Sequence, residues 1–270
     1  MPLPFIMEPT ELAALLAQPC GKLLILDLGA EQTYRTGHID GAVHVPAQKI
    51  VCAQPPVPGK IASKEQLEKL FSFLGLTPDT HVVVYDDEGG GWAGRMIWTL
   101  DAIGHKQYSY LNGGLHAWMA SGQSLTTEVP VVTPTQVNIK IDPKVVIEIP
   151  DILGEMDRAD FVVWDARSPA EYSGERITAQ KNGHIPGAIN CEWTNLMDPN
   201  QALRIRTDAR DYVTALGFTP DKRIITHCQG HHRSGFTYLV GKALGLNIRA
   251  YHGSWAEWGN HPTTPVVQTE

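Results

Sequence analysis

The sequence predicts an α/β protein made of two similar domains, each with a central, mostly parallel sheet flanked by helices. Three observations lead to this prediction. Short apolar segments of strand type alternate with amphipathic segments of helix type, their order recurs in the second half of the 270 residues, and a stretch with three prolines separates the two halves. Alternating strands and helices are typical of a parallel sheet that is covered on both faces.

The first half contains the expected elements in a regular order. We expect a helix that begins after Thr10 as its cap, a Pro- and Gly-rich loop in the middle and a short helix carrying Trp118 at the end. The expected segments are, in order, a helix over 11–17, a strand over 23–27, a helix over 64–74, a strand over 81–85, a helix over 92–103 and a closing segment over 108–111.

The second half repeats features of the first in the same order, at an offset of about 140 residues. The matched features are two strand ends, a Gly-His-Ile-x-Gly-Ala motif and a closing segment followed by tryptophan. They pair Asp27 with Asp165, 37–42 with 183–188, Asp86 with Cys228, and 111–115 with 251–255. Four matches in one order indicate a duplicated domain, and about 125 residues per copy is an ordinary domain size.

The repeat divides the chain into a first domain over 1–128, a linker over 129–146 and a second domain over 147–270. Pro130, Pro134 and Pro143 make the segment between the domains typical of an extended linker. We expect the domains to pack around a cleft that receives the loop after Cys228. The first domain is expected to be non-catalytic, because it has Asp86 where the second has the cysteine.

Duplication also separates structural features from chemical ones. His38 and His184 lie in the motif that both halves share, and Asp27 and Asp165 both end a strand. We therefore expect all four to build the fold. The loop after the second strand differs most between the halves. The first-half loop is longer by one residue and mainly acidic, so we expect it to repel anions where the loop after Cys228 attracts them.

The loop that follows Cys228 is the strongest candidate for a chemical site. A β-branched strand over 224–226 leads to Cys228, polar residues follow, and a helical pattern starts at Gly235. In such a strand, loop and helix arrangement the N–H groups of the loop and helix start converge on one point. These groups, the helix dipole and Arg233 are expected to lower the pKa of Cys228 and favour the thiolate.

Three other interpretations of this loop exist, and the residues favour none of them. An inert core cysteine would have apolar or small neighbours, whereas those of Cys228 are polar and cationic. The sequence signal for a metal site is unspecific, because one tight turn cannot readily arrange several ligands around one ion. The candidate ligands are His227, Cys228, His231 and His232, with His252 as a further one. We expect His231 and His232 instead to add positive charge or donors at the rim, and His227 to belong to the strand.

A phosphatase-like cysteine enzyme is the remaining interpretation. Such a loop would have five residues between the cysteine and the arginine, so that the arginine could contact two phosphate oxygens. Here only four residues separate Cys228 from Arg233. The smaller ring suits one additional sulfur atom on Cys228 better than a tetrahedral oxyanion, so loop length favours sulfur transfer over phosphoryl transfer.

Together these motifs resemble the rhodanese family of sulfurtransferases. The tandem arrangement, the paired Gly-His-Ile-x-Gly-Ala motifs, the Asp165-Ala166-Arg167 strand end, the Cys-x4-Arg loop and the closing Gly-Ser-Trp segment all match. The loop looks most like that of a bacterial subgroup of thiosulfate sulfurtransferases with Cys-Gln-x-His-His-Arg-Ser. The resemblance implies a ping-pong cycle through a persulfide on Cys228, without organic cofactor or metal. It also implies a binding loop made of Gln229, Gly230, His231, His232, Arg233 and Ser234.

The resemblance also bears on the sulfur donor. Mercaptopyruvate enzymes place a substrate-binding arginine six residues after the strand-end aspartate, and this chain has Glu171 there, which is expected to repel a carboxylate. Arg176 and Lys181 lie nearby in the sequence and are candidate substrate contacts. We therefore expect thiosulfate as donor and cyanide or a thiol as acceptor. The alternatives are a 3-mercaptopyruvate sulfurtransferase, and a persulfide carrier that delivers sulfur to a protein partner.

Composition limits the class of protein further. A net charge of −7 without a run of Lys or Arg argues against nucleic-acid binding. No apolar stretch approaches the roughly 18 residues that a membrane span needs, and the first 20 residues lack signal-peptide features. Cys20, Cys52, Cys191 and Cys228 form no Cys-x-x-Cys pair, which is typical of free thiols in a reducing cytoplasm. We expect a cytoplasmic monomer.

Overall fold

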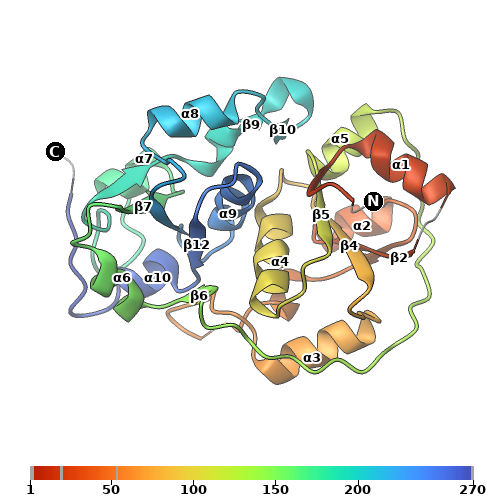
Figure 1. The fold of residues 1–270 in the computed structure, drawn as a ribbon, viewed down its shortest axis with the longest axis horizontal. Helices are drawn as coiled ribbons and strands as arrows, with labels where there is room; N and C mark the ends of the chain where they lie inside the picture. Colours follow the sequence, from red (N-terminus) through yellow and green to blue (C-terminus); the bar gives the residue numbers. More distant parts are fainter. Residues whose placement is uncertain (1–2, 19–20, 53, 269–270) are drawn as a thin grey trace.

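Figure 1 shows the computed structural model, which describes residues 3–18, 21–52 and 54–268 and in which two domains lie side by side. Cys20 lies outside the described residues. In the first domain the strands are β1 (Ile6–Met7), β2 (Lys22–Asp27), β3 (Ala42–His44), β4 (Thr80–Tyr85) and β5 (Tyr108–Leu111). Its helices are α1 (Pro9–Ala17), α2 (Glu31–Thr36), α3 (Lys64–Phe73), α4 (Gly91–Ala102) and α5 (Gly114–Ala120), with a 3₁₀ turn, η1 (Ala47–Lys49).

The second domain repeats this order and adds a small hairpin. Its strands are β6 (Val146–Ile147), β7 (Phe161–Asp165), β8 (Ala188–Asn190), β9 (Met197–Asp198), β10 (Arg204–Ile205), β11 (Arg223–His227) and β12 (Ile248–Tyr251). Its helices are α6 (Ile149–Glu155), α7 (Pro169–Ser173), α8 (Ala209–Ala215), α9 (Arg233–Ala243) and α10 (Ser254–Trp258), with 3₁₀ turns η2 (Trp193–Leu196) and η3 (Pro199–Gln201).

The two main sheets have the same topology. Their strand orders are β1-β5-β4-β2-β3 and β6-β12-β11-β7-β8, and all neighbours within them are parallel. The central strands β4 and β11 are buried along nearly their whole length and end at Tyr85 and His227. The predicted α/β class with two similar domains is therefore confirmed. Because β4 and β11 end at equivalent places, the loops after Tyr85 and His227 lie at equivalent edges of the two sheets.

Some element boundaries differ from the predicted ones. The predicted cap Thr10 is wrong, because α1 already begins at Pro9 and the Glu11 carboxylate accepts a hydrogen bond from the N–H of Glu8 at 2.7 Å. Proline is tolerated there because the first helical N–H groups have no partner in the helix. Among the described residues, no helix combines the length and the apolar character that a membrane crossing requires.

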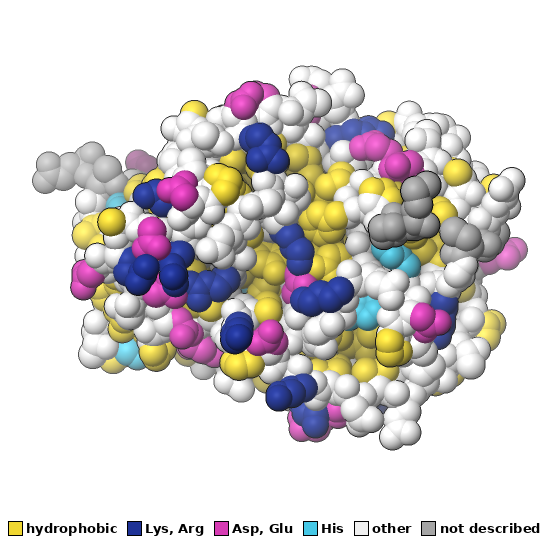
Figure 2. All heavy atoms as spheres, viewed as in Figure 1, with side chains coloured by type: hydrophobic (Ala, Val, Ile, Leu, Met, Phe, Trp, Pro, Cys, Tyr) yellow, Lys and Arg dark blue, Asp and Glu magenta, His cyan; other side chains and the backbone are white. Residues whose placement is uncertain are grey.

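Helices α4 and α9 form the centre of the interface between the domains, and Figure 1 shows them next to each other. They approach most closely at two glycines. A Cβ atom added to Gly94 would lie 2.2 Å from the carbonyl oxygen of Gly235, so any side chain here would force the helices apart. Nearby, buried Asp101 of α4 accepts hydrogen bonds from Tyr108 at 2.7 Å and, across the interface, from Tyr238 at 2.8 Å. In the face shown in Figure 2, apolar side chains line the boundary between the domains.

The segment between the domains is extended and fixed to the first domain. Residues 127–142 have no regular secondary structure. The backbone N–H groups of Thr135 and Ile139 donate to the Ser72 carbonyl at 2.9 Å and to Glu68 Oε1 at 2.8 Å, respectively. The predicted linker 129–146 therefore packs along α3, and its last residue already belongs to β6.

Candidate active site

Cys228 lies directly after β11, and the helix α9 begins five residues later at Arg233. Its side chain is almost completely buried. Ser234 Oγ donates a hydrogen bond to Cys228 Sγ at 3.4 Å, and the backbone N–H of Cys228 donates to Ser254 Oγ at 3.3 Å. The strand, loop and helix predicted around Cys228 are therefore present, and the sulfur is enclosed by the turn.

The environment of Cys228 favours the thiolate. Burial alone would raise the pKa of Cys228, but three kinds of neighbour lower it: the charge of Arg233, the Ser234 hydroxyl, and the backbone N–H groups of Ser234 and Gly230. The lowering effects are larger, so the pKa of Cys228 lies below its ordinary value. The lowered pKa agrees with the prediction from the sequence, which also attributed it to Arg233 and the backbone N–H groups of the loop.

His231 acts on Cys228 through Ser234, and it does not add charge to the rim as we expected. The His231 ring is fully buried, and burial and the nearby Arg95 charge lower its pKa well below the ordinary value, so the ring is neutral. His231 Nδ1 lies 2.8 Å from Ser234 Oγ. When Cys228 is a thiolate it can only accept, so the Ser234 hydroxyl donates to Sγ and Nδ1 is the donor in the contact with Ser234. The neutral imidazole thus orients the hydroxyl toward the sulfur.

Ser234→Ala is expected to raise the pKa of Cys228, because it removes the hydroxyl that donates to the sulfur. The thiolate is the form favoured above the pKa of Cys228. When the pH is lowered, the variant should therefore lose its sulfur-transfer activity at a higher pH than the wild type does. The measurement is the pH–rate profile, with Ser234→Thr as the control that keeps a hydroxyl. A Ser234→Ala profile that coincides with the wild type would contradict this role.

Arg233 is held by Glu171, the residue that we expected to repel a carboxylate. The guanidinium donates two hydrogen bonds to this carboxylate, Nη1 to Oε2 at 2.6 Å and Nη2 to Oε1 at 2.9 Å. Burial would raise the pKa of Glu171, but the contacts with Arg233 and Ser168 lower it to about 2. Glu171 is thus not a free acid, so the expectation that it repels substrate must be corrected. It fixes the position of Arg233.

The other predicted site residues lie in different settings. Gln229 exchanges hydrogen bonds with Thr178, from Thr178 Oγ1 at 2.9 Å and to the Thr178 carbonyl at 3.1 Å. Lys181 is wrong as a substrate contact, because its ammonium group donates to His261 and Thr264 of the C-terminal segment at 2.6–2.7 Å. Arg176 is exposed and stays a prediction.

The first domain supplies side chains at the edge of the Cys228 loop, which the sequence did not indicate. His232 Nε2 is paired with the carboxylate of Glu88, and this contact raises the pKa of His232 although burial lowers it. The His232 ring lies between Trp92 and Trp193, with ring centroids 4.6 and 5.5 Å away. His232 is therefore the loop histidine that pairs with a carboxylate of the first domain, and the two domains meet on it.

The structure gives the loop histidines separate partners. His227 Nε2 lies 3.5 Å from Asp165, His231 contacts Ser234, and His232 contacts Glu88. In the part of the chain that the structure describes, no group of three or more His, Cys, Asp or Glu side chains is arranged to hold a metal ion. The potential ligands that are close in the sequence therefore do not point to one place in the structure.

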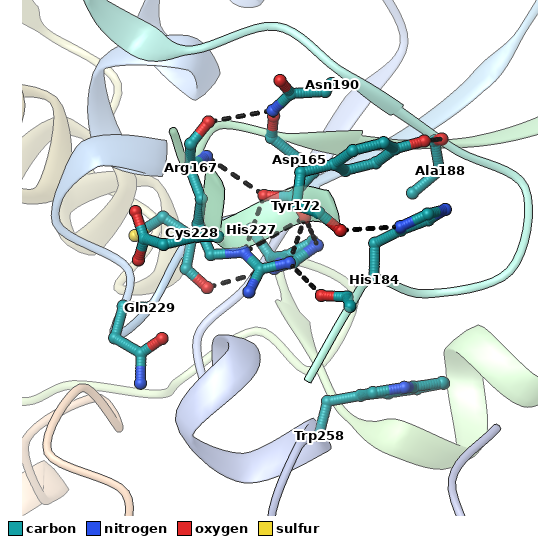
Figure 3. Close-up of polar contacts among 12 residues, drawn as sticks. Asp165, Arg167, Tyr172, His184, Ala188, Asn190, His227, Cys228, Gln229 and Trp258 are labelled. Atoms are coloured by element: carbon teal, nitrogen blue, oxygen red, sulfur yellow. Dashed lines mark hydrogen bonds and ion pairs between the residues drawn. The ribbon is translucent and has the colours of Figure 1, made fainter. Parts of the chain in front are cut away.

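Behind the loop, the shared motifs have structural roles in both domains. Figure 3 shows Asp165 and Arg167 joined by several hydrogen bonds, the shortest from Arg167 Nη2 at 2.6 Å, with His184 stacked near Tyr172. His184 Nδ1 donates to the Tyr172 carbonyl at 2.8 Å, and His38 makes the same contact with Tyr34 in the first domain. The two histidines therefore anchor a turn.

The equivalent loop of the first domain is also an anion cradle, but its own carboxylate fills it. Asp86 Oδ1 accepts backbone hydrogen bonds from Glu88, Gly89 and Gly90 at 2.8–3.2 Å, and Oδ2 accepts from Ala93 at 3.0 Å. The expectation that this loop simply repels anions is thus corrected, because its donors are already used. A side chain added to Gly89 would also meet Met197 of the β9–β10 segment, which covers the loop.

Asp86→Cys is expected not to create a second active half. The new sulfur would be buried under the β9–β10 segment, beside the negative charges of Asp87 and Glu88. Thiocyanate formation should stay at background when Asp86→Cys is combined with Cys228→Ala, the latter alone being the control. Activity near the wild-type level in the double variant would show that the contrast between the loops does not determine which domain reacts.

The fold and the loop define a tandem α/β protein with one enclosed, thiolate-favouring cysteine. The chain belongs to the rhodanese family: the family model described as a Rhodanese-like domain matches residues 8–121 and 149–261. This confirms the resemblance inferred from the motifs.

Similar proteins extend over nearly the whole chain. The chain is 52% identical to thiosulfate sulfurtransferases of Azotobacter vinelandii, over 265 residues, and Pseudomonas aeruginosa, over 267 residues. Both matches cover 98% of this chain and 97% of the relative. The crystal structure of YnjE has the same fold, with a TM-score of 0.86, 22% identity, and coverage of 98% of this chain and 68% of that one.

Proposed function

We propose that this protein is a thiosulfate sulfurtransferase that works through a persulfide on Cys228. The Cys228 thiolate attacks the outer sulfur of thiosulfate, the sulfur–sulfur bond of thiosulfate breaks, and its electron pair leaves with sulfite. The sulfur bound to Cys228 is then attacked by cyanide or a thiol, and the thiolate leaves. The observation that carries the proposal is the buried Cys228 sulfur enclosed by the turn, with the Ser234 hydroxyl donating to Sγ at 3.4 Å; this setting lowers the pKa of Cys228. The full-length identity to thiosulfate sulfurtransferases supports the donor.

The residues of the loop have distinct roles in this proposal. Cys228 is the catalytic residue, and the N–H groups of Gly230 and Ser234 together with the Ser234 hydroxyl stabilise the negative sulfur. Arg233 adds a positive charge whose position is set by Glu171. Because Glu171 already occupies both terminal nitrogens of Arg233 and supplies its counter-charge, the pair favours thiosulfate over the carboxylate of 3-mercaptopyruvate.

Steady-state kinetics test the proposal. With thiosulfate and cyanide varied together, double-reciprocal plots should give parallel lines, because sulfite leaves before cyanide reacts. The value of kcat/KM should be higher with thiosulfate than with 3-mercaptopyruvate. A higher value with 3-mercaptopyruvate would contradict the donor. Intersecting lines would contradict the persulfide route, and slow turnover with rapid transfer to a protein acceptor would identify a carrier.

The same proposal covers cofactor, partners and location. We propose that no organic cofactor or metal takes part, because both steps exchange one sulfur atom between nucleophiles. The partners are a small anionic donor and cyanide or a thiol, with a protein acceptor as the alternative. We also propose a monomer in the cytoplasm, which the free thiols of Cys52, Cys191 and Cys228 support.

A further inference from the structure

Arg95 is a buried cation of the domain that lacks the cysteine. It lies on α4 and has no exposed surface. Its Nη1 donates to the carbonyl oxygens of Gly59 at 2.8 Å and His231 at 3.3 Å, and its Nη2 donates to that of Ile50 at 3.3 Å. The guanidinium also lies 4.8 Å from the ring centroid of Trp98. Arg95 thus joins the connection between η1 and α3 of the first domain to the catalytic loop of the second.

What distinguishes Arg95 is its lack of a carboxylate partner. Among the described residues its hydrogen bonds all go to carbonyl oxygens, and its Nε–H has no acceptor. By contrast, buried Arg167 is paired with Asp165, and Arg233 is paired with Glu171. Burying a cation without a counter-charge is costly, so a nearby negative charge would stabilise Arg95.

The Cys228 thiolate is the negative charge available to Arg95. Burial lowers the pKa of Arg95, and the charge of Cys228 is the group that opposes this effect. The contact between Arg95 and the His231 carbonyl places the guanidinium within the same loop that encloses the sulfur. Arg233 is the larger influence on the pKa of Cys228, and Arg95 adds a second cation that contacts the backbone of the same turn.

We propose that Arg95 is a positioning residue for sulfur transfer, which fixes the Cys228 loop through the His231 carbonyl and supplies the counter-charge for the thiolate and the persulfide. The inference rests on the proposed function only in taking Cys228 as the reacting group. It assigns a task to the first domain, whose own loop is filled by Asp86.

The backbone at His231 shows why the loop needs such an anchor. His231 has a φ of 54°, in the left-handed region that a residue with a side chain rarely adopts. In a planar trans peptide the C=O and the following N–H point in opposite directions. Holding the His231 carbonyl on Arg95 therefore turns the His232 N–H away from the arginine and stabilises this unusual turn.

The neighbouring loop of the first domain supports the same contact from the other side. A Cβ atom added to Gly59 would lie 2.0 Å from the carbonyl oxygen of Gly230, so the two loops touch backbone to backbone. Arg95 donates to Gly59 and to His231 with the same nitrogen. One guanidinium thus fixes the position of the Gly59 loop relative to the Cys228 loop.

Other charged and titratable groups surround the Cys228 loop, but each has its own partner or is neutral. Arg233 is paired with Glu171, and His232 with Glu88. The pKa values of His227, His231 and His252 are lowered, in each case chiefly by burial. The groups that face the loop are Asp165 at the end of β7, Glu171 on α7, His227 on β11, His231 and His232 in the loop, Arg233 on α9, His252 after β12, and Asp86, Glu88 and Arg95 from the first domain.

The test measures the pKa of Cys228 directly, from the pH dependence of its alkylation by iodoacetamide, followed by mass spectrometry of the Cys228 peptide. Arg95→Gln should raise this pKa by about half a unit, because it removes a positive charge near the thiolate and the donor that holds the His231 carbonyl, while Arg233 remains in place. Arg95→Lys keeps the charge and should stay within about half of that shift. Arg35→Gln, which removes an exposed arginine of α2, is the matched control and should leave the pKa unchanged.

Each outcome decides the inference. A folded Arg95→Gln protein with the wild-type thiol pKa would overturn it. Should Arg95→Gln fail to fold, Arg95→Met, which keeps a long side chain without the charge, takes its place. Alkylation needs no sulfur donor, so a failure of the proposed function would appear separately, as a wild-type protein that thiosulfate does not load with sulfur.

Discussion

Cys228→Ala is expected to abolish sulfur transfer, with a loss of about 10⁴-fold or more in the rate of thiocyanate formation from thiosulfate and cyanide. The reason is that the variant removes the atom to which the transferred sulfur binds. The backbone donors of the loop remain, but they have no nucleophile to stabilise. Retained activity in a folded Cys228→Ala protein would show that another group reacts with thiosulfate.

The other cysteines provide the control for this prediction. Burial raises the pKa of Cys191 to about 12, so its thiol is unreactive at neutral pH. Cys52 is partly exposed, but it lacks the enclosing turn of Cys228. Cys52→Ala should therefore transfer sulfur at the wild-type rate, and the same holds for Cys20→Ala. A large loss in either would mean that sulfur passes through a second thiol.

Asp165→Ala is expected to destabilise the protein by about 3–5 kcal/mol, because it leaves a buried arginine without its counter-charge. The Asp165 carboxylate accepts hydrogen bonds from the backbone N–H of Arg167 at 3.0 Å, from Nε at 2.9 Å and from Nη2 at 2.6 Å. Arg167 is also fully buried, 4.2 Å from the ring centroid of Trp255. The measurement is the free energy of unfolding in urea.

The repeat supplies a matched control, since Asp27 ends the equivalent strand of the first domain. Asp27 accepts a hydrogen bond from Gly29 N–H at 2.7 Å, and the residue two positions after it is Gly29, where the second domain has Arg167. Burial raises the pKa of Asp27, so its carboxylate is not strongly stabilised. Asp27→Ala should therefore cost about 1–3 kcal/mol, less than Asp165→Ala. Equal losses would contradict the importance of the arginine pair.

The same pair predicts a pH dependence of stability. Burial would raise the pKa of Asp165, but the neighbouring His227, the charge of Arg167 and the hydrogen bonds from Arg167 lower it below the ordinary value. A carboxyl with a lowered pKa in the folded state contributes stability above its unfolded pKa, and the contribution is lost as the pH falls through the folded pKa. Asp165→Ala should therefore differ from the wild type most at neutral pH and least in acid.

The architecture could be predicted from the sequence because each main strand and helix has a strong local pattern. The two copies of that pattern also confirm each other. The edge strands β1 and β6 were not predicted, because two residues are too few to show a period. The β9–β10 hairpin was missed for the same reason. Its position over the Asp86 loop depends on packing between the domains, which a local pattern does not contain.

The strand, loop and helix around Cys228 could be predicted, since these residues are consecutive and Cys228 is absent from the first copy, but the contact of His231 with Ser234 could not. What the sequence did not indicate is the share of the first domain in the site. Glu88, Trp92 and Arg95 reach the Cys228 loop because α4 and α9 cross at Gly94 and Gly235. One signal was present in the sequence: Arg95 is a charge within the otherwise mainly apolar helix over 92–103. Lys181 was misassigned, because proximity in sequence says nothing about side-chain direction.

The central claim is that Cys228 carries the transferred sulfur, and the intact mass of the protein tests it most directly. Wild-type protein and Cys228→Ala are measured before thiosulfate, after thiosulfate and after cyanide. We expect the wild type to gain one sulfur atom, about 32 Da, and to lose it again to cyanide as thiocyanate. The variant should gain nothing. An equal gain on Cys228→Ala, or no gain on folded wild-type protein, would contradict the claim.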